Sequence, residues 1–320
     1  MSFLRFIAVS TGAAVAISWL LSWSRKYLKS LTRLACVQVP RNVVLRDLTE
    51  FRMKLGVFCI GGANKLKVFS DFDHTLTPLY RNGGRAKVSY GVLEDSLFLD
   101  SRYKHENELL YQKYYLIEKD PNLSVKEKTP HMIKWWRRAH DLLIKFQMKK
   151  KYIPEMVRAA NIGLRSGVVE LFDCLSYKNV PVAIVSAGIG DIILEVLRQH
   201  YPRFNEHKFH LVSNRMTFSE EGDLVGWSGM LVHTFNKKNQ LQEHEENPER
   251  SNLLVLGDHD YDAFVASRIY ADAQIKIGFL NDVSSPSDPR VAKYLQHYDV
   301  VILDDGNCDF ILDLVNTICE

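Results

Sequence analysis

The chain has 320 residues, of which 46% are hydrophobic and 25% are charged, and its 41 basic and 38 acidic side chains leave a net charge of +3. This length allows one large or two modest domains with a sizeable core. The charge is too small to indicate a nucleic-acid polymer as a partner. Five cysteines without a Cys-x-x-Cys pair argue against a disulfide framework or a zinc knuckle and favour a reducing compartment.

The first apolar stretch, residues 6–23, is uncharged and close to the roughly 20 residues that span a bilayer. It is preceded by Arg5 and followed by a basic flank, Arg25, Lys26, Lys29 and Arg33. The positive-inside rule then places the rest of the chain in the cytosol. We expect a membrane anchor over residues 1–29, in the endoplasmic reticulum; without it the chain would be cytoplasmic. A cleaved signal peptide is the alternative, although its charged region should precede the apolar run.

A short apolar run at residues 66–70 predicts a buried strand that ends in two carboxylates, Asp71 and Asp73. Two like charges at a buried strand end are costly unless a cation or a substrate uses them. Open α/β sheets bind ligands at the carboxyl ends of parallel strands. The alternative is an Asx-turn, with Asp73 capping the residues that follow.

Residues 78–166 lack β-branched runs and contain long amphipathic segments, with helical faces at 106–118 and 130–147. We interpret them as a helical insertion after the first strand. Its aromatic residues predict either the core of the insertion or a surface that stacks a planar ligand: Tyr111, Tyr114, Tyr115, Trp135 and Trp136.

From residue 167 strands and helices alternate, which predicts an α/β fold with a parallel sheet and helices on both faces. The expected strands are 181–186, 210–218, 252–256, 273–279 and 299–303, and the expected helices are 168–178, 191–200, 262–269, 289–297 and 309–318. A small hairpin is expected at residues 223–229.

Three later loops carry residues that suit phosphate chemistry. Ser186 and Ala187 follow a strand and precede a helix, where a hydroxyl and free N–H groups bind anions. Lys237 can supply a point charge to a phosphate. Asp258 and Asp262 follow another apolar strand and would reach the first two aspartates, giving oxygen ligands for Mg²⁺. Each has an ordinary structural alternative, but their order after strands of one sheet makes the set specific.

The ordered set DFDHTL, VSAG, Lys237 and GDHDYD resembles the haloacid-dehalogenase (HAD) superfamily of phosphotransferases. The segments GGANKLKVFSDFDHTLT, KYYLIEKDP, SAGIGDII, VHTFNK, LLVLGD and KIGFLND are similar to the cytosolic pyrimidine 5′-nucleotidase (5′-nucleotidase III) family, from about residue 42 to the C-terminus. The resemblance implies a HAD-like Rossmannoid core over residues 30–77 and 167–320, and a helical cap over 78–166 that selects the substrate.

The family further implies Mg²⁺-dependent hydrolysis of nucleoside 5′-monophosphates such as CMP, UMP or 7-methyl-GMP by a monomer. Asp71 would attack phosphorus to form an aspartyl-phosphate, and Asp73 would act as general acid and then base. Mg²⁺ would be held by Asp71, the Asp73 carbonyl and Asp258. The phosphate would be bound by Lys237, Ser186 and Ala187, with Asp262 orienting Lys237 or the metal waters.

By the same resemblance Glu118 faces the base. Three residues depart from the family pattern: His74, Ala139 and His259. Ala139 stands where relatives can carry a serine, which leaves the choice between purine and pyrimidine open. Two alternatives remain, a HAD phosphatase for another small phosphomonoester and a catalytically silent nucleotide-binding protein.

Overall fold

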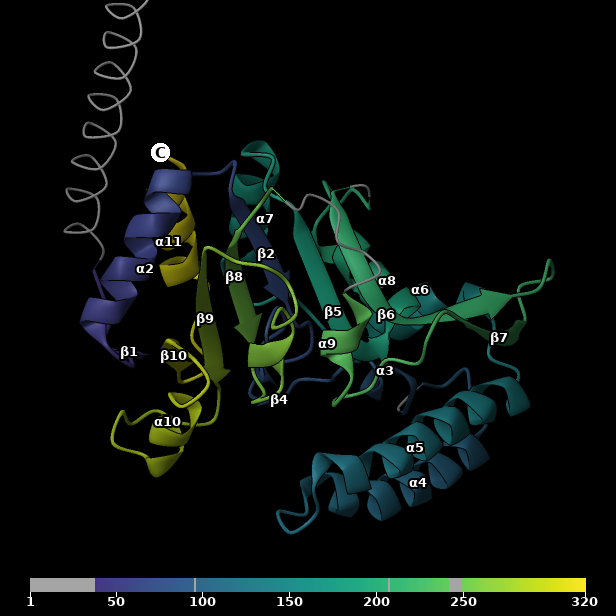
Figure 1. Ribbon diagram of the computed structural model, residues 1–320. Coiled ribbons are helices and arrows are strands. Elements are labelled where there is room, and N and C mark those ends of the chain that lie inside the picture. Colours follow the sequence, from purple (N-terminus) through teal and green to yellow (C-terminus); the bar gives the residue numbers. More distant parts are fainter. Residues whose placement is uncertain (1–37, 95, 207, 242–248) are drawn as a thin grey trace, which may run out of the picture.

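The computed structural model describes residues 38–94, 96–206, 208–241 and 249–320 (Figure 1). In these residues an eight-stranded sheet has the order β1-β10-β9-β8-β2-β5-β6-β7. Its strands are β1 (Val43–Leu45), β2 (Leu66–Ser70), β5 (Val182–Ile189), β6 (Phe209–Phe218), β7 (Leu224–Ser228), β8 (Asn252–Gly257), β9 (Ala273–Leu280) and β10 (Val300–Leu303).

The sheet is mixed, so the prediction of a wholly parallel sheet is wrong. The six central strands are parallel, but β1 runs antiparallel to β10 and β7 runs antiparallel to β6. The turn between β6 and β7 has Gly222 at φ 84°, and a short turn of this kind can join only antiparallel strands. The expected hairpin thus extends the sheet edge, while β1, three residues long, is too short to stand out as a strand in the sequence.

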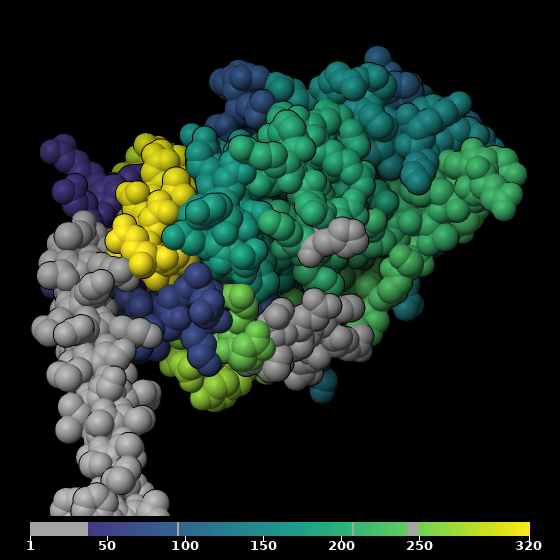
Figure 2. Space-filling view, turned by 90° about the horizontal axis from the view of Figure 1, so that it is seen from above, coloured from purple at the N-terminus to yellow at the C-terminus, as the bar shows by residue number. Residues whose placement is uncertain are grey.

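The strands of the sheet centre are buried on both faces, which explains their continuous apolar sequence. Val68 packs into a large cluster with the helices α2 (Leu48–Gly61), α7 (Val168–Tyr177), α8 (Gly190–His200) and α11 (Asp309–Cys319). Phe69 points to the opposite face, where a smaller cluster includes Val265 and Leu241. Short helices lie on that side: α9 (Lys237–Gln240) and η3 (Asp262–Phe264). Figure 2 shows the yellow α11 packed beside the teal α7. Both helices contribute side chains to the larger cluster.

The segment after β2 forms a small hairpin and a series of helices. These elements are β3 (Tyr80–Arg81), β4 (Gly84–Arg85), α3 (Gly91–Glu94), α4 (Ser101–Lys119), α5 (Val125–Lys145), η1 (Lys150–Tyr152) and α6 (Ile153–Ala160). Asp100 caps α4, and Ser124 and Glu127 form a capping box at the start of α5, because side-chain oxygens satisfy the free N–H groups of a first turn. The antiparallel pair α4–α5 lies beyond the carboxyl ends of the central strands (Figure 1).

The membrane helix expected in residues 6–23 lies outside the described residues. Within the described residues no helix is long and apolar enough to cross a bilayer. The long helices α4 and α5 carry charged residues along their whole length, so neither offers the uncharged run that a span requires. No described helix therefore supports the transmembrane part of the predicted fold. The last element to be named, the short helix α10 (Pro289–Tyr294), lies between β9 and β10 in the chain.

Candidate active site

Asp71 lies at the carboxyl end of β2, in the middle of the sheet. β2 pairs with β5 on one side and with β8 on the other, and the Asp71 N–H donates to the Leu256 carbonyl at 3.0 Å. The Asp71 side chain is only 8% exposed. Burial raises the pKa of Asp71 to about 7, because a carboxylate loses its hydration there. The strand thus presents an acidic group that needs a cationic neighbour.

Lys237, the first residue of α9, is that neighbour. Its Nζ lies 2.6 Å from Asp71 Oδ1 and 2.8 Å from Asp262 Oδ1. Burial acts to lower the pKa of Lys237, but the two carboxylates outweigh it and hold that pKa above its ordinary value. The lysine is therefore a fixed positive charge between two aspartates, where a phosphate oxygen could also be bound.

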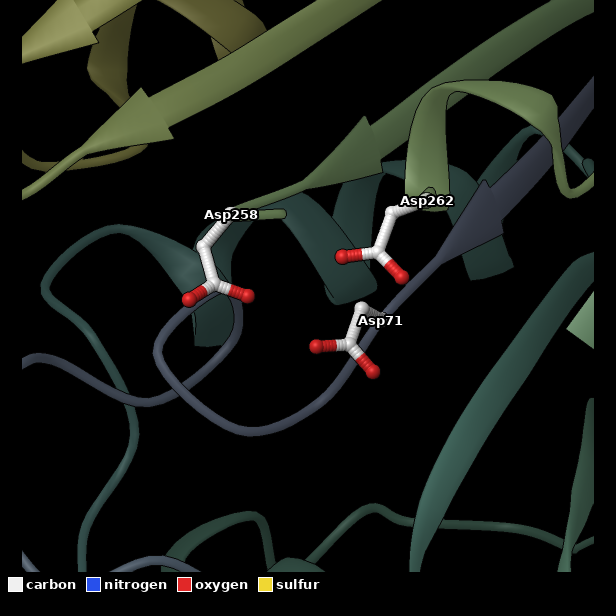
Figure 3. A group of neighbouring side chains, drawn as sticks. All are labelled: Asp71, Asp258 and Asp262. Carbon is white, nitrogen blue, oxygen red and sulfur yellow. The ribbon is translucent and has the colours of Figure 1, made fainter. Parts of the chain in front are cut away.

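A third carboxylate, that of Asp258, joins this group. One oxygen from each of Asp71, Asp258 and Asp262 lies within 4.8 Å of the other two (Figure 3). Burial, and then the charge of Asp71, raises the pKa of Asp258 well above its usual range. Three carboxylates that converge in a buried space form the hard oxygen donor set that suits Mg²⁺. The donors present therefore fit the metal that the sequence implies, with Asp262 inside the cluster as well as bound to Lys237.

The Asp73 carboxylate belongs to a separate network. Its Oδ1 accepts from the Ser89 N–H at 2.7 Å, and its Oδ2 accepts from Ser89 Oγ at 2.6 Å. Ser89 is fully buried, so the carboxylate is held in one orientation. No sequence motif pointed to Ser89, because it lies sixteen residues away in an irregular segment.

Ser186 and its neighbours form a bulge near the end of β5, where the pairing with β6 is irregular between Val185 and Ile189. Bulges of this kind often occur next to active sites because they release backbone groups from the ladder. The Gly188 N–H donates to Ser186 Oγ at 3.0 Å. A Cβ on Gly188 would lie 2.0 Å from Ser89 Oγ and 3.1 Å from Asp73 Oδ2. The loop therefore lies directly against Asp73, and only glycine fits there.

Two further buried residues hold these loops in place. Asn214 of β6, 2% exposed, donates to the carbonyls of Ala187 and Val232 at 2.8 and 2.9 Å. Arg165 donates to the carbonyls of Thr75 and His74, both at 2.7 Å. Sequence reasoning missed both residues. A polar residue within a strand and an arginine next to an apolar helix were the available signals, but neither has a spacing that indicates its partner.

Between α3, α4 and α5 lies a cavity of about 190 Å³ with aromatic walls. Its lining residues are Val88, Tyr90, Glu94, Asn107, Tyr111, Trp135, Trp136 and Ala139. Tyr114, by contrast, is 1% exposed in a small core cluster. Trp135 and Trp136 pack against this cluster and also line the cavity, so the core interpretation is confirmed for Tyr114, whereas the stacking of a planar ligand stays a prediction. Glu94 and Asn107 contribute polar side chains to the lining, and Asn107 Nδ2 donates to Glu94 Oε1 at 3.2 Å.

The remaining predicted residues lie around this centre. Glu118 does not line the cavity; its Oε1 accepts from Thr234 Oγ1 at 2.7 Å. His74 has φ 61°, and its N–H donates to Thr77 Oγ1 at 2.9 Å, so it serves the turn after Asp73. The His259 N–H donates to Asp262 Oδ2 at 3.1 Å, while its ring stacks on Tyr261. Neither ring joins the carboxylate cluster.

The family whose sequence model matches residues 74–319 is described as pyrimidine 5′-nucleotidase (UMPH-1). The 7-methylguanosine phosphate-specific 5′-nucleotidase of Homo sapiens is 37% identical over 281 residues, which cover 86% of this chain and 92% of that protein. The putative cytosolic 5′-nucleotidase 3 of Caenorhabditis elegans is 32% identical over 86% of this chain and 76% of its own length.

Among solved structures, cytosolic 5′-nucleotidase IIIB bound to cytidine superposes with a TM-score of 0.79 at 30% identity, over 88% of this chain and 94% of that one. A HAD family hydrolase of Salmonella enterica matches at a TM-score of 0.50 and 15% identity, over 79% of this chain and 72% of that one, a likeness of fold alone. The resemblance seen in the sequence is confirmed, and so is the enzyme class. The chain belongs to the pyrimidine 5′-nucleotidase family, whose members are phosphoric monoester hydrolases of the HAD-like fold.

Proposed function

We propose that the chain is a Mg²⁺-dependent 5′-nucleotidase that converts pyrimidine or 7-methylguanine nucleoside 5′-monophosphates to nucleoside and phosphate. One observation carries the proposal: the chain has a buried group of Asp71, Lys237, Asp258 and Asp262 and an aromatic cavity, and Trp136 of the cavity wall donates to the Ala187 carbonyl of the loop after β5. Charged groups of this kind suit a phosphate, and an aromatic cavity suits a flat base. The names of the matching family and of the relatives supply the two base classes.

Asp71 is the proposed nucleophile. One of its oxygens attacks phosphorus, the bond to the 5′-oxygen of the nucleoside breaks, and an aspartyl-phosphate forms. Asp73, held by Ser89, gives its proton to the leaving 5′-oxygen. It then takes a proton from a water molecule, which attacks phosphorus and releases phosphate and the free Asp71 carboxylate. The two carboxylates have separate partners, and this supports their separate roles.

The remaining charged groups neutralise the phosphate. Lys237 would bind a phosphate oxygen, with Ser186 Oγ and the backbone N–H groups of the Ala187–Gly188 loop on the others. Asp71, Asp258 and the Asp73 carbonyl would hold Mg²⁺, and Asp262 would orient Lys237. The bound metal would supply charge neutralisation on the phosphoryl oxygens.

The base would enter the aromatic cavity. We propose that residues 30–77 and 167–320 form the catalytic core and that residues 78–166 form a cap that carries this cavity. Glu94, which lines the cavity, and Glu118, which lies on the same group of helices, are the two carboxylates that could accept a hydrogen bond from an amino group of the base. The cavity's position between α3, α4 and α5 supports a role of the cap in substrate choice.

The compartment follows from two observations. Two of the similar proteins are named as cytosolic, and no disulfide joins Cys59, Cys174, Cys308 or Cys319 in the described part of the chain. Free thiols are usual where the surroundings are reducing. We infer that the enzyme acts on free nucleotides in the cytosol.

Phosphate release by the full chain with Mg²⁺ tests the proposal. The substrates are CMP, UMP, 7-methyl-GMP, AMP, GMP and ribose 5-phosphate. We expect CMP, UMP or 7-methyl-GMP to be hydrolysed with the highest kcat/KM. Release from ribose 5-phosphate alone would retain the phosphatase chemistry but reject the nucleotide substrate. No release from any compound would leave a nucleotide-binding protein.

A further inference from the structure

The peptide between Ala187 and Gly188 is held from its carbonyl side. The Ala187 oxygen accepts two hydrogen bonds, from Trp136 Nε1 at 3.0 Å and from Asn214 Nδ2 at 2.8 Å. In a planar trans peptide the C=O and the following N–H point in opposite directions. Because these two donors fix the carbonyl, the Gly188 N–H is held in the opposite direction, where Ser186 Oγ accepts it.

Gly188 lies next to Asp73, the proposed general acid. Its Cα faces Asp73 and Ser89 so closely that a Cβ would collide with Ser89 Oγ. An N–H beside the proposed general acid can donate to an oxygen of the transferring phosphoryl group, and such fixed donors stabilise developing charge without reorganisation. The orientation of this one peptide therefore bears on turnover.

The two anchors come from different parts of the molecule. Asn214 belongs to β6 and is also bound to both the N–H and the carbonyl of Val232, so it is part of the rigid sheet. Trp136 belongs to α5, and its ring also lines the aromatic cavity, edge-on to Tyr90 at 6.3 Å. The Trp136 side chain thus lines the cavity and also donates a hydrogen bond to the Ala187 carbonyl, which belongs to the same peptide as the Gly188 N–H.

We propose that Trp136 is a positioning residue that links the base cavity to the phosphate site: its indole N–H, together with Asn214, orients the Ala187–Gly188 peptide toward the phosphoryl group. The inference rests on the proposed function. Because the Trp136 N–H acts on the peptide through the Ala187 carbonyl and not through the base, its effect on the rate extends to phosphate esters that have no base.

Trp136→Phe tests this, since it keeps an aromatic wall and removes only the N–H. With the full chain and Mg²⁺, kcat should fall on the order of tenfold for CMP and also for ribose 5-phosphate, which has no base. A residue that only lines the cavity would instead raise KM for CMP and leave ribose 5-phosphate unaffected, and that result would overturn the inference. Asn214→Ala removes the other anchor and should lower kcat for both substrates as well.

Trp227→Phe is the matched control, because the Trp227 indole nitrogen is buried without a hydrogen-bond partner in the described residues. Trp227→Phe should leave kcat for CMP and kcat for ribose 5-phosphate within about twofold of the wild-type values. Calorimetric binding of inorganic phosphate separates this inference from the proposed function. Trp136→Phe should weaken phosphate binding on the order of tenfold, and equal affinities overturn the inference. Absence of nucleotide hydrolysis by the wild-type chain would overturn the proposed function instead.

Discussion

Lys237 Nζ lies 2.6 Å from Asp71 Oδ1, and each of the two side chains is only 8% exposed. Removing two charges from water is costly, and such a pair seldom adds much net stability. What the pair does provide is a nucleophilic carboxylate held in one place next to a cation that can bind the incoming phosphate. The second contact of Lys237, to Asp262, keeps the ammonium group in place when Asp71 reacts.

Asp71→Asn should abolish turnover while the chain stays folded, because the amide has the same shape but is a poor nucleophile. Loss of a nucleophile typically lowers kcat roughly 10⁴-fold or more. Phosphate release and thermal melting are the two measurements. Asp282→Asn, which changes an exposed carboxylate paired with Arg290, should retain wild-type kinetics. Substantial activity in Asp71→Asn would rule Asp71 out as the nucleophile.

Lys237→Met should destabilise the protein as well as slow it. Without the ammonium group the neighbouring carboxylates are left buried and unpaired, which typically costs roughly 3–5 kcal/mol of unfolding free energy. Urea denaturation in EDTA measures this loss. Lys238→Met is the matched control, since Lys238 is the next residue of α9 and is exposed. Equal stabilities of the two variants would show that Lys237 is not needed to hold the carboxylates.

Mg²⁺ should raise the melting temperature of the wild-type chain, because a ligand that binds only the folded state stabilises it by about 2.7 kcal/mol at 100 times its Kd. Asp258→Asn should remove most of this shift, since it takes one carboxylate out of the cluster. Asp260→Asn is the control, because the Asp260 carboxylate instead lies 3.6 Å from Lys293. The metal site would be misplaced if Asp258→Asn responded to Mg²⁺ as wild type does.

Much of this site could be predicted from the sequence, because most of its charged residues lie just after a strand or in a motif that the sequence reveals. Asp71, Lys237 and Asp258 follow readable strands or motifs, and the structure brings them together. Ser89 and Asn214 could not be found this way, since a hydrogen bond between an irregular segment and a strand end leaves no period in the sequence. The antiparallel edge strand β1 was missed for a related reason. β1 is three residues long, and its pairing with β10 depends on tertiary contacts between distant parts of the chain.

Base selectivity should depend on Glu94 more than on Glu118. Glu94 lines the aromatic cavity, where it accepts from Asn107, whereas Glu118 does not line the cavity and accepts from Thr234. Glu94→Gln keeps the size but loses the charge, and should reduce the preference for CMP over UMP by roughly tenfold, the usual effect of a hydrogen bond to a charged group. Glu118→Gln is the direct comparison. Loss of the preference in Glu118→Gln alone would assign the base contact to Glu118.

The stability of the protein should fall in mild acid partly because of His140. This ring is 5% exposed; it stacks on Trp227 with centroids 3.6 Å apart, and its Nε2 lies 2.7 Å from the Tyr90 hydroxyl. Burial lowers the pKa of His140 from 6.5 to about 3, because the ring cannot be hydrated when charged. The folded protein therefore keeps this histidine neutral at a pH where an unfolded chain would bind a proton.

Between pH 6.5 and about 3, then, the unfolded state takes up a proton that the folded state does not, and unfolding becomes easier as the pH falls. The His140 contribution to this loss approaches about 1.4 kcal/mol per pH unit, or about 2 kcal/mol between pH 7 and pH 5. His140→Gln cannot bind the proton, so its deficit relative to wild type should shrink by that amount over the same interval. Urea denaturation of both proteins at pH 7, 6 and 5 measures the difference, in which the other titrating groups cancel. A deficit that stays constant with pH would mean that His140 binds its proton equally well in the folded and unfolded states.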